Sequence, residues 1–181
     1  MNEVIQAMIQ RRSIRKLKAD AVPDGLLSRI VEAGLYAASG MGRQSSIIAV
    51  VTEKTLRDRL MEMNCAIGRE KGFEWTKGFD PFYGAPAILI VLAKKEVSTR
   101  VYDGSLVMGN LMLAAHSLGL GSIWIHRAKE EFETPQGQEF LKALGISGEW
   151  EGIGHCAVGF MDGALPPPPP RNEGRVFCAK G

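Results

Sequence analysis

Three arginines and a serine form a compact basic cluster near the start of the chain, in the segment Arg11-Arg12-Ser13-Ile14-Arg15. In an extended segment, side chains alternate between two sides, so Arg11, Ser13 and Arg15 would share one side. A guanidinium group stays charged and can donate two hydrogen bonds to one phosphate. The cluster therefore predicts an anion clamp for a phosphate monoester. The alternative is that Arg11 and Arg12 lie in the last turn of a helix, offset its dipole and are otherwise solvated.

Composition indicates a soluble globular protein. The chain has 181 residues, of which 45% are hydrophobic and 23% charged, enough for one domain with a substantial core. A formal net charge of +2 gives no general case for nucleic-acid binding. No signal peptide or membrane-length apolar run is visible, and the three cysteines lack metal-ligand spacing. We expect a cytoplasmic protein with no nucleic-acid, membrane or metal partner.

Hydrophobic periodicity predicts the elements that must position the cluster. Helices are expected over residues 4–9, 26–38, 52–63, 99–118 and 135–144. Short apolar runs without polar alternation predict buried strands at residues 47–51, 86–93, 122–125 and 154–160. The helix over residues 99–118 is apolar on more than one side, so we expect it at the centre of the core. The aromatic-rich residues 73–83 have no clean period and fit either a pocket lid or an irregular packed loop.

The C-terminal residues have a different composition. Five prolines at residues 166–170 form a stiff spacer that cannot join the interior of a sheet. Arg171 and Arg175 follow, and then the apolar, β-prone residues 176–178. We therefore divide the chain into a domain over residues 1–165 and a proline-rich arm over residues 166–181 that belongs to the same domain. A disordered tail is the alternative.

Four features together resemble the nitroreductase superfamily of FMN-dependent oxidoreductases. They are the Arg-Arg-Ser-x-Arg start, Ala38-Ser39 with Gln44 before a strand, Ala85-Pro86 before the next strand, and Leu113-Ala114-Ala115 through Gly119-Leu120-Gly121 to Trp124. The resemblance covers nearly the whole chain. It implies an α+β fold with a mixed central sheet flanked by helices, built as an intertwined homodimer with FMN at two interface sites.

The resemblance also implies which residues contact the cofactor. The phosphate and ribityl chain would be held by Arg11, Arg12, Ser13 and Arg15, with Arg171 and Arg175 completing the phosphate site. A loop with Ala38, Ser39, Gly40 and Gln44 would approach the flavin from the partner subunit. The main chain of Trp124, Ile125, His126 and Arg127 would face the reactive edge of the ring, where an N–H group can stabilise negative charge.

Departures from the family pattern limit what can be transferred. Alanine at Ala38 replaces the usual proline, and Gly42, Ser45 and Ser46 replace the residues that surround the retained Gln44. His126 is a candidate proton donor, with a packing or ribityl contact as the alternative. His116 and His155 are expected to be structural, and no catalytic side chain is identified with certainty.

The activity implied is transfer of a hydride from NADH or NADPH through FMN to a small acceptor by a ping-pong mechanism. A nitroaromatic, a quinone or an enone would suit that chemistry. The alternative is an FMN-binding protein without dedicated nicotinamide turnover, reduced by a partner protein. The sequence does not distinguish the physiological acceptor, the preferred nicotinamide or whether turnover is the biological role.

Overall fold

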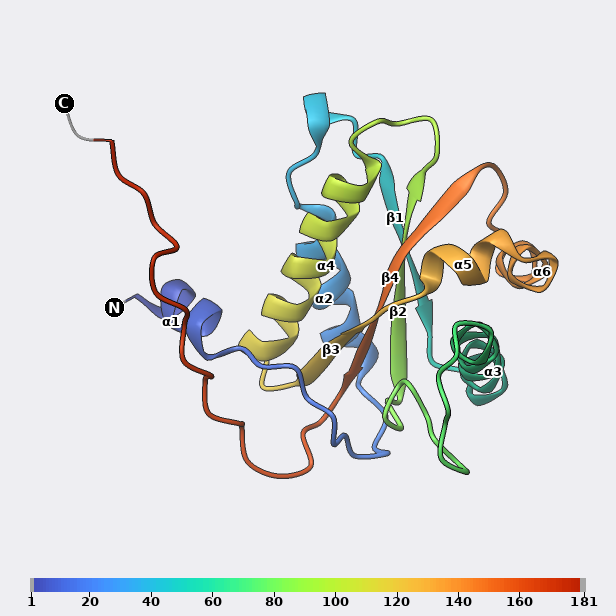
Figure 1. Ribbon diagram of the computed structural model, residues 1–181, viewed down its shortest axis with the longest axis horizontal. Helices are drawn as coiled ribbons and strands as arrows, with labels where there is room; N and C mark the ends of the chain where they lie inside the picture. Colours follow the sequence, from blue (N-terminus) through green and yellow to red (C-terminus); the bar gives the residue numbers. More distant parts are fainter. Residues whose placement is uncertain (1, 180–181) are drawn as a thin grey trace.

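The computed structural model describes residues 2–179, and its centre is a four-stranded sheet covered by helices on both faces (Figure 1). The strands are β1 (Ser46–Val51), β2 (Ala87–Lys94), β3 (Gly121–Ile125) and β4 (Trp150–Gly159). The helices are α1 (Glu3–Gln10), α2 (Asp24–Leu35), α3 (Lys54–Glu70), α4 (Arg100–Ser117), α5 (Ala128–Glu133) and α6 (Pro135–Ala143), with a short 3-10 turn η1 (Gly40–Gly42).

The sheet has the order β1-β2-β4-β3, and every pair of neighbouring strands is antiparallel. The expectation of a mixed sheet is therefore wrong for residues 2–179. Parallel pairing there is limited to an isolated bridge between Ser13 and Ser122. The connections from β1 to β2 and from β3 to β4 return to the end of the sheet that they leave, which makes these strands antiparallel. β2 and β3 run in the same direction, and α4 carries the chain back between them.

Two hydrophobic clusters lie on opposite faces of the sheet. One joins Leu89 and Val91 of β2 to α2 and the central helix α4, including Met108 and Leu111. The other joins the alternate β2 residues to α3, α5 and α6. Because side chains alternate across a strand, a continuous apolar run such as β2 serves both faces. Its residues 87–93 are all buried, as the sequence predicts.

Several helix ends follow directly from local chemistry. The Asn2 side chain accepts a hydrogen bond from the Ile5 N–H at 3.0 Å and caps α1, as expected. Thr134 caps α6 in the same way, with Pro135 at its first position. Gly119 has φ of 78°, the left-handed conformation predicted for the residue that ends α4.

Other expectations need correction. β1 is an edge strand whose first four residues are only half-buried, so its lack of polar alternation does not reflect burial on both faces. α3 continues to Glu70 and β4 begins at Trp150, both beyond their predicted bounds, and α5 had no sequence signal. Residues 176–178 form no strand and are exposed, and residues 180–181 of the arm lie outside the described residues.

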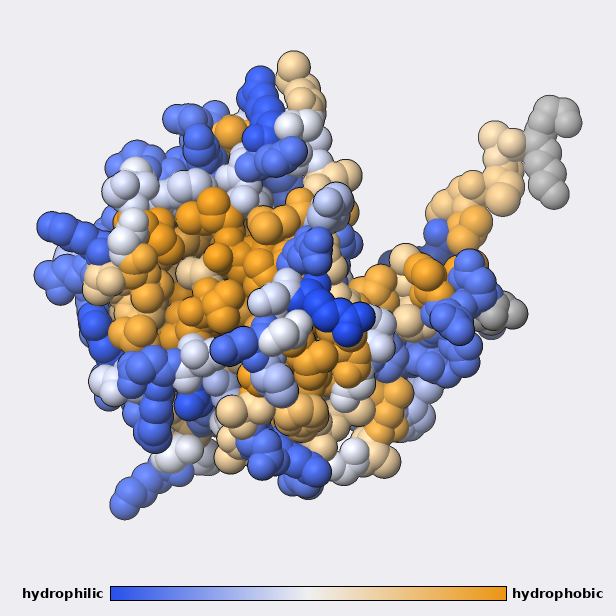
Figure 2. Space-filling view, turned by 180° about the vertical axis from the view of Figure 1, so that it is seen from behind, coloured by the Kyte–Doolittle hydropathy of each residue, from blue (hydrophilic) through white to orange (hydrophobic). Residues whose placement is uncertain are grey.

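Apolar side chains are exposed near β1 and on α1. Figure 2 shows a broad apolar area on the face behind the view of Figure 1, over the region of this edge strand. Val50 of β1 keeps 44% of its surface exposed. α1 has no buried residue, and its apolar stripe is about half exposed. Within residues 2–179, no helix is long and apolar enough to cross a membrane.

Candidate functional site

The basic cluster is an extended segment fixed between two parts of the sheet. α1 ends at Gln10, and Ser13 then forms its bridge to Ser122 of β3. The Ile14 N–H donates to the Ser122 carbonyl at 3.0 Å, and the Ile14 side chain is buried. Further along, the Lys18 N–H donates to Phe160 just after β4. The extended conformation predicted for this segment is therefore confirmed.

The guanidinium groups of Arg11 and Arg12 contain buried donors without partners. Among the described residues, Arg11 Nη1 and both Nε and Nη2 of Arg12 are buried and have no hydrogen-bond partner. Arg12 Nη1 donates to the Ile9 carbonyl at 2.8 Å, so Arg12 contacts the end of α1. The alternative interpretation is nevertheless wrong, because α1 ends at Gln10 and both arginines follow it and are half-buried. Buried N–H groups of this kind are costly unless an acceptor meets them. The cluster is therefore prepared for an anion.

The charge of this cluster reaches neighbouring groups. Burial, followed by the Arg11 and Arg12 charges, lowers the pKa of His116. Burial raises the pKa of Cys156 to about 12, although the nearby Arg11 acts in the opposite direction. His116 therefore sits in a positive field, and Cys156 remains a thiol at neutral pH. Neither supplies a counter-charge to the arginines.

Arg15 differs from the first two arginines because its side chain is exposed. With Ser13 it lines a cavity of about 350 Å³ whose far wall is formed by the residues that follow β4. That wall includes Asp162 and Pro166 at the start of the arm. The cluster and the base of the arm thus lie side by side.

The loop of residues 38–44 has an unusual backbone. Met41 and Gln44 have φ of 57° and 48°, in the left-handed region that non-glycine residues rarely adopt. The Ser39 hydroxyl accepts a hydrogen bond from the Gln44 N–H at 2.9 Å, which closes the loop. Ala38, Ser39 and Gln44 all line one cavity of about 130 Å³, so the structure brings these predicted residues together.

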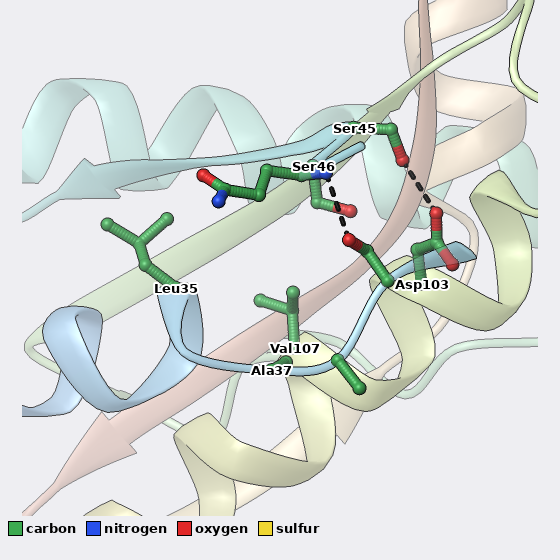
Figure 3. Close-up of a pocket in the computed structure, with 9 residues that line it drawn as sticks. Leu35, Ala37, Ser45, Ser46, Asp103 and Val107 are labelled. Carbon is green, nitrogen blue, oxygen red and sulfur yellow. Dashed lines mark hydrogen bonds between the residues drawn. The ribbon is translucent and has the colours of Figure 1, made fainter. Parts of the chain in front are cut away.

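Asp103, which sequence reasoning missed, holds this loop in place (Figure 3). Its buried carboxylate accepts hydrogen bonds from the Gly40 N–H at 2.9 Å, the Ser45 hydroxyl at 2.9 Å and the Thr99 hydroxyl at 3.0 Å. Burial opposes the charged form, but these three bonds outweigh it and lower the pKa of Asp103. A side chain at Gly40 would have its Cβ only 2.5 Å from the Thr99 hydroxyl, so glycine is required there.

The loop and the arginine cluster lie at opposite ends of α4. The loop is tied to Asp103 in the first turn of α4, whereas the cluster is tied to Ser122, just beyond the other end. A helix of 18 residues is about 27 Å long. The structure of one chain therefore does not bring Ser39 and Arg11 together.

At the strand end, residues 124–127, the main chain is more available for contacts with a ligand than the side chains are. Trp124 packs over Gly154, where an added Cβ would lie 2.2 Å from its indole nitrogen, and Ile125 is buried on the other face. His126 is exposed. Its side chain has no hydrogen-bond partner within residues 2–179, so no hydrogen bond orients it as a proton donor.

The Arg127 side chain is occupied within the chain. Its Nη1 donates to Asn64 Oδ1 at 2.8 Å, and the guanidinium carbon lies 5.0 Å from the centre of the Phe73 ring and 5.2 Å from that of Trp75. Trp75 in turn stacks between Phe73 and Phe79 and donates to the Cys65 carbonyl at 3.0 Å. Residues 73–79 thus form a packed aromatic layer on α3, which favours the packed-loop interpretation.

Arg171 and Arg175 of the arm are exposed and lie near each other, lining a shallow hollow with Pro170 and Asn172. The arm extends away from the sheet in Figure 1. Within the described residues, neither arginine forms an ion pair. Their predicted phosphate contact stays a prediction.

Comparison with known proteins gives consistent matches. A model of the Nitroreductase family matches residues 8–160. A nitroreductase from Bacteroides fragilis, solved with bound FMN, superposes with a TM-score of 0.90 at 27% identity, covering 99% of this chain and 100% of that one. A nitroreductase with bound FMN from Desulfitobacterium hafniense gives 0.88 at 26% identity, with the same coverage.

Curated relatives match more locally. The NADPH-flavin oxidoreductase of Vibrio harveyi is 30% identical over 132 residues, which are 69% of this chain and 54% of the relative. A Methanothermobacter thermautotrophicus protein, provisionally named NADH dehydrogenase/NAD(P)H nitroreductase, is 29% identical over 67% of this chain and 60% of its own length. The chain thus spans little more than half of these two relatives. Because the family model covers most of the sequence, the chain belongs to the Nitroreductase family.

Proposed function

We propose that the chain is an FMN-dependent oxidoreductase that takes reducing equivalents from NADH or NADPH. The family assignment, the FMN-bound structures it resembles and the names of its curated relatives support this function. The single observation that carries it is the set of buried arginine donors without partners.

The residues present fit the phosphate of FMN. Arg11 and Arg12 offer three buried nitrogen donors, and Ser13 adds a hydroxyl beside them. Charge-assisted bonds from guanidinium to phosphate oxygen are among the strongest hydrogen bonds that proteins form. When bound, the flavin would supply two-electron redox chemistry, and the chain would hold and orient it and exclude water. The loop at Ser39 and the strand end at Ile125 would contribute the remaining contacts.

A homodimer is part of this proposal. Two partial sites at opposite ends of α4 would become complete if the loop of one subunit met the arginine cluster of the other. α1 leaves an apolar stripe of four residues 48–58% exposed, a surface that association would cover. β1 offers an unpaired edge. A second copy of the chain would complete the partial sites, cover the apolar stripe of α1 or pair with the edge of β1.

The arm over residues 166–181 would reach the partner subunit. Val176 and Phe177 are 82% and 92% exposed, which is unfavourable for large apolar side chains in water. Five prolines at about 3.1 Å each give the arm reach, and residues 176–178 suit pairing with a sheet edge. Truncation after Leu165 tests this: we expect dimerisation by light scattering and FMN affinity to fall together. An unchanged dimer with unchanged affinity would show that the arm is dispensable.

The acceptor is proposed to be a small nitroaromatic, quinone or enone, reduced in a ping-pong cycle in which the nicotinamide leaves before the acceptor enters. The three free cysteines fit a reducing compartment, and we propose the cytoplasm.

Purification and steady-state kinetics test the function. We expect yellow protein that releases FMN on heating and oxidises NADH or NADPH. Double-reciprocal plots against the nicotinamide concentration should be parallel at several fixed concentrations of the acceptor. Recovery of FAD alone, or failure to bind added FMN, would contradict the proposal. FMN binding without nicotinamide oxidation would favour reduction by a partner protein instead.

A further inference from the structure

The peptide between His126 and Arg127 is held in one orientation by a side chain from another element. Asn64 of α3 donates from Nδ2 to the His126 carbonyl at 2.8 Å. In a trans peptide the N–H points opposite to the carbonyl, so the Arg127 N–H points away from Asn64. Within residues 2–179 this N–H has no hydrogen-bond partner.

The bonds of Asn64 leave no freedom in its amide. Both Nδ2 hydrogens are used, one on the His126 carbonyl and one on Glu131 Oε1, while Oδ1 accepts from Arg127 Nη1 at 2.8 Å. A flipped amide would place its oxygen against two acceptors and its NH₂ group against a cation. The chemistry of the neighbours therefore fixes this orientation.

Glu131 and His155 form a buried second layer behind Asn64. Glu131 Oε2 lies 2.8 Å from His155 Nε2, and both side chains are fully buried. α5 comes close enough to the sheet for this contact only because Gly152 has no side chain, since a Cβ there would lie 2.2 Å from the Ala128 carbonyl oxygen. A buried polar group is stable only while its partners stay in place. The pair thus keeps Asn64 in position.

Without these contacts, the peptide between His126 and Arg127 would not favour this conformation. Arg127 has φ of 81°, a left-handed conformation that non-glycine residues rarely adopt. Such strain persists where the surroundings over-determine it, and it is commonest at functional sites. Here Asn64 contacts both the carbonyl before Arg127 and its guanidinium group.

We propose that Asn64, supported by Glu131 and His155, is a positioning residue that presents the Arg127 N–H to the flavin. This inference rests on the proposed function, which places the end of β3 beside the cofactor. A fixed N–H donor aimed at a ring atom that gains negative charge on reduction stabilises the reduced form without reorganisation. A peptide free to turn over would present its carbonyl instead, which repels that charge.

The test compares Asn64→Leu with Asn110→Leu. Asn110 also bonds a main-chain carbonyl, that of Ala33 at 3.0 Å, but it joins α2 to α4 away from the strand end. Each variant is loaded with FMN, and the FMN dissociation constant, the two-electron reduction potential and the thermal midpoint are measured. Both variants should lose thermal stability.

For Asn64→Leu, we expect the preference for reduced over oxidised FMN to fall about tenfold, which is about 30 mV in potential. Its affinity for oxidised FMN should change only a few-fold, because the arginine cluster is intact. Asn110→Leu should keep the parent potential.

Four outcomes would count against the inference. An Asn64→Leu potential equal to that of the parent overturns it while the proposed function stands. Equal shifts in both variants would show a general loss of packing and also overturn it. A parent protein that binds no FMN overturns the proposed function and this inference together. If Asn64→Leu does not fold, Glu131→Gln takes its place, and a potential that stays at the parent value overturns the inference, because Glu131 is proposed to hold Asn64 in position.

Discussion

The family resemblance assigns both Arg11 and Arg127 to the cofactor, Arg11 through its side chain and Arg127 through its main chain. The surroundings of their two side chains are opposite. Arg127 has its partners within the chain: Asn64 accepts from it, and the rings of Phe73 and Trp75 lie against it. Arg11 Nη1 is buried and has no partner among the described residues.

The difference separates two kinds of basic residue. A guanidinium group whose donors are already paired stabilises the folded chain and has little left for a ligand. One whose donors are buried and unpaired costs free energy in the empty protein and regains it when an anion arrives. Unmet donors, not positive charge itself, therefore indicate the anion site.

Of these variants, Arg11→Met should show the largest effect. It should weaken FMN binding without lowering the stability of the FMN-free protein. Removing a charge-assisted contact should weaken FMN binding roughly 10- to 100-fold. The thermal midpoint of the FMN-free protein should not fall, because Arg11 Nη1 has no partner to lose. Fluorescence titration and thermal unfolding measure the two quantities. Arg29→Met, an exposed change on α2, is the control. A lower midpoint with unchanged affinity would reverse the roles proposed for the two arginines.

Arg127→Met should lower the stability of the protein and have less effect on FMN binding. The FMN-free protein should lose about 2 kcal/mol of unfolding free energy, because a charge-assisted bond to Asn64 and cation–π contacts are removed. FMN affinity should change less than in Arg11→Met. Urea unfolding and flavin titration provide the comparison. Stability equal to that of the parent, together with strongly weakened FMN binding, would be inconsistent with the paired environment of Arg127.

Asp103→Asn extends the comparison to a paired carboxylate. The folded-state pKa of Asp103 lies below its ordinary value, so the charged form contributes stability above the ordinary pKa, and this contribution is lost as pH falls through the lowered one. We expect a loss of about 1–2 kcal/mol at pH 7. The difference in unfolding free energy between Asp103→Asn and the parent should shrink below about pH 4. Urea unfolding from pH 3 to 7 measures it, and a difference independent of pH would exclude a charged Asp103.

Arg15→Ala should have the smallest effect of the cluster, because this side chain is exposed. We expect FMN affinity to fall by roughly tenfold at most, since solvent weakens exposed charge contacts. Arg15→Lys should recover part of the loss, as it keeps the charge without the planar fork. A loss greater than that of Arg11→Met, measured by the same titration, would indicate that burial does not rank these arginines.

Local chemistry explains why much of the fold was predictable. The Asn2 and Thr134 caps and the left-handed Gly119 depend on neighbours in sequence, and each was predicted correctly. Strand direction and edge position depend on distant segments. An apolar run such as residues 47–51 is the same whether its strand is central or at the edge, so the half-exposed β1 and the antiparallel sheet could not be predicted.

The missed site residues did leave a weak signal. Asp103 lies at the helical spacing of Val107 and Leu111, so a single acidic residue interrupts a buried stripe of α4. Asn64 likewise follows Leu60 on the buried side of α3. A polar residue at a core position has to find a partner, but its identity is not encoded nearby. Predicting α3 only to residue 63 placed Asn64 outside the helix altogether.

The sequence by itself determined the family, the residue types of the clamp and the caps that delimit its helices, because these depend on local order and spacing. Only the tertiary structure decided which arginines are paired and which are not, because burial and hydrogen bonding join residues as distant as Asn64 and Arg127. It also decided that α4 separates Ser39 from Arg11, since helix length and packing, and not composition, set the distance between two ends of a helix.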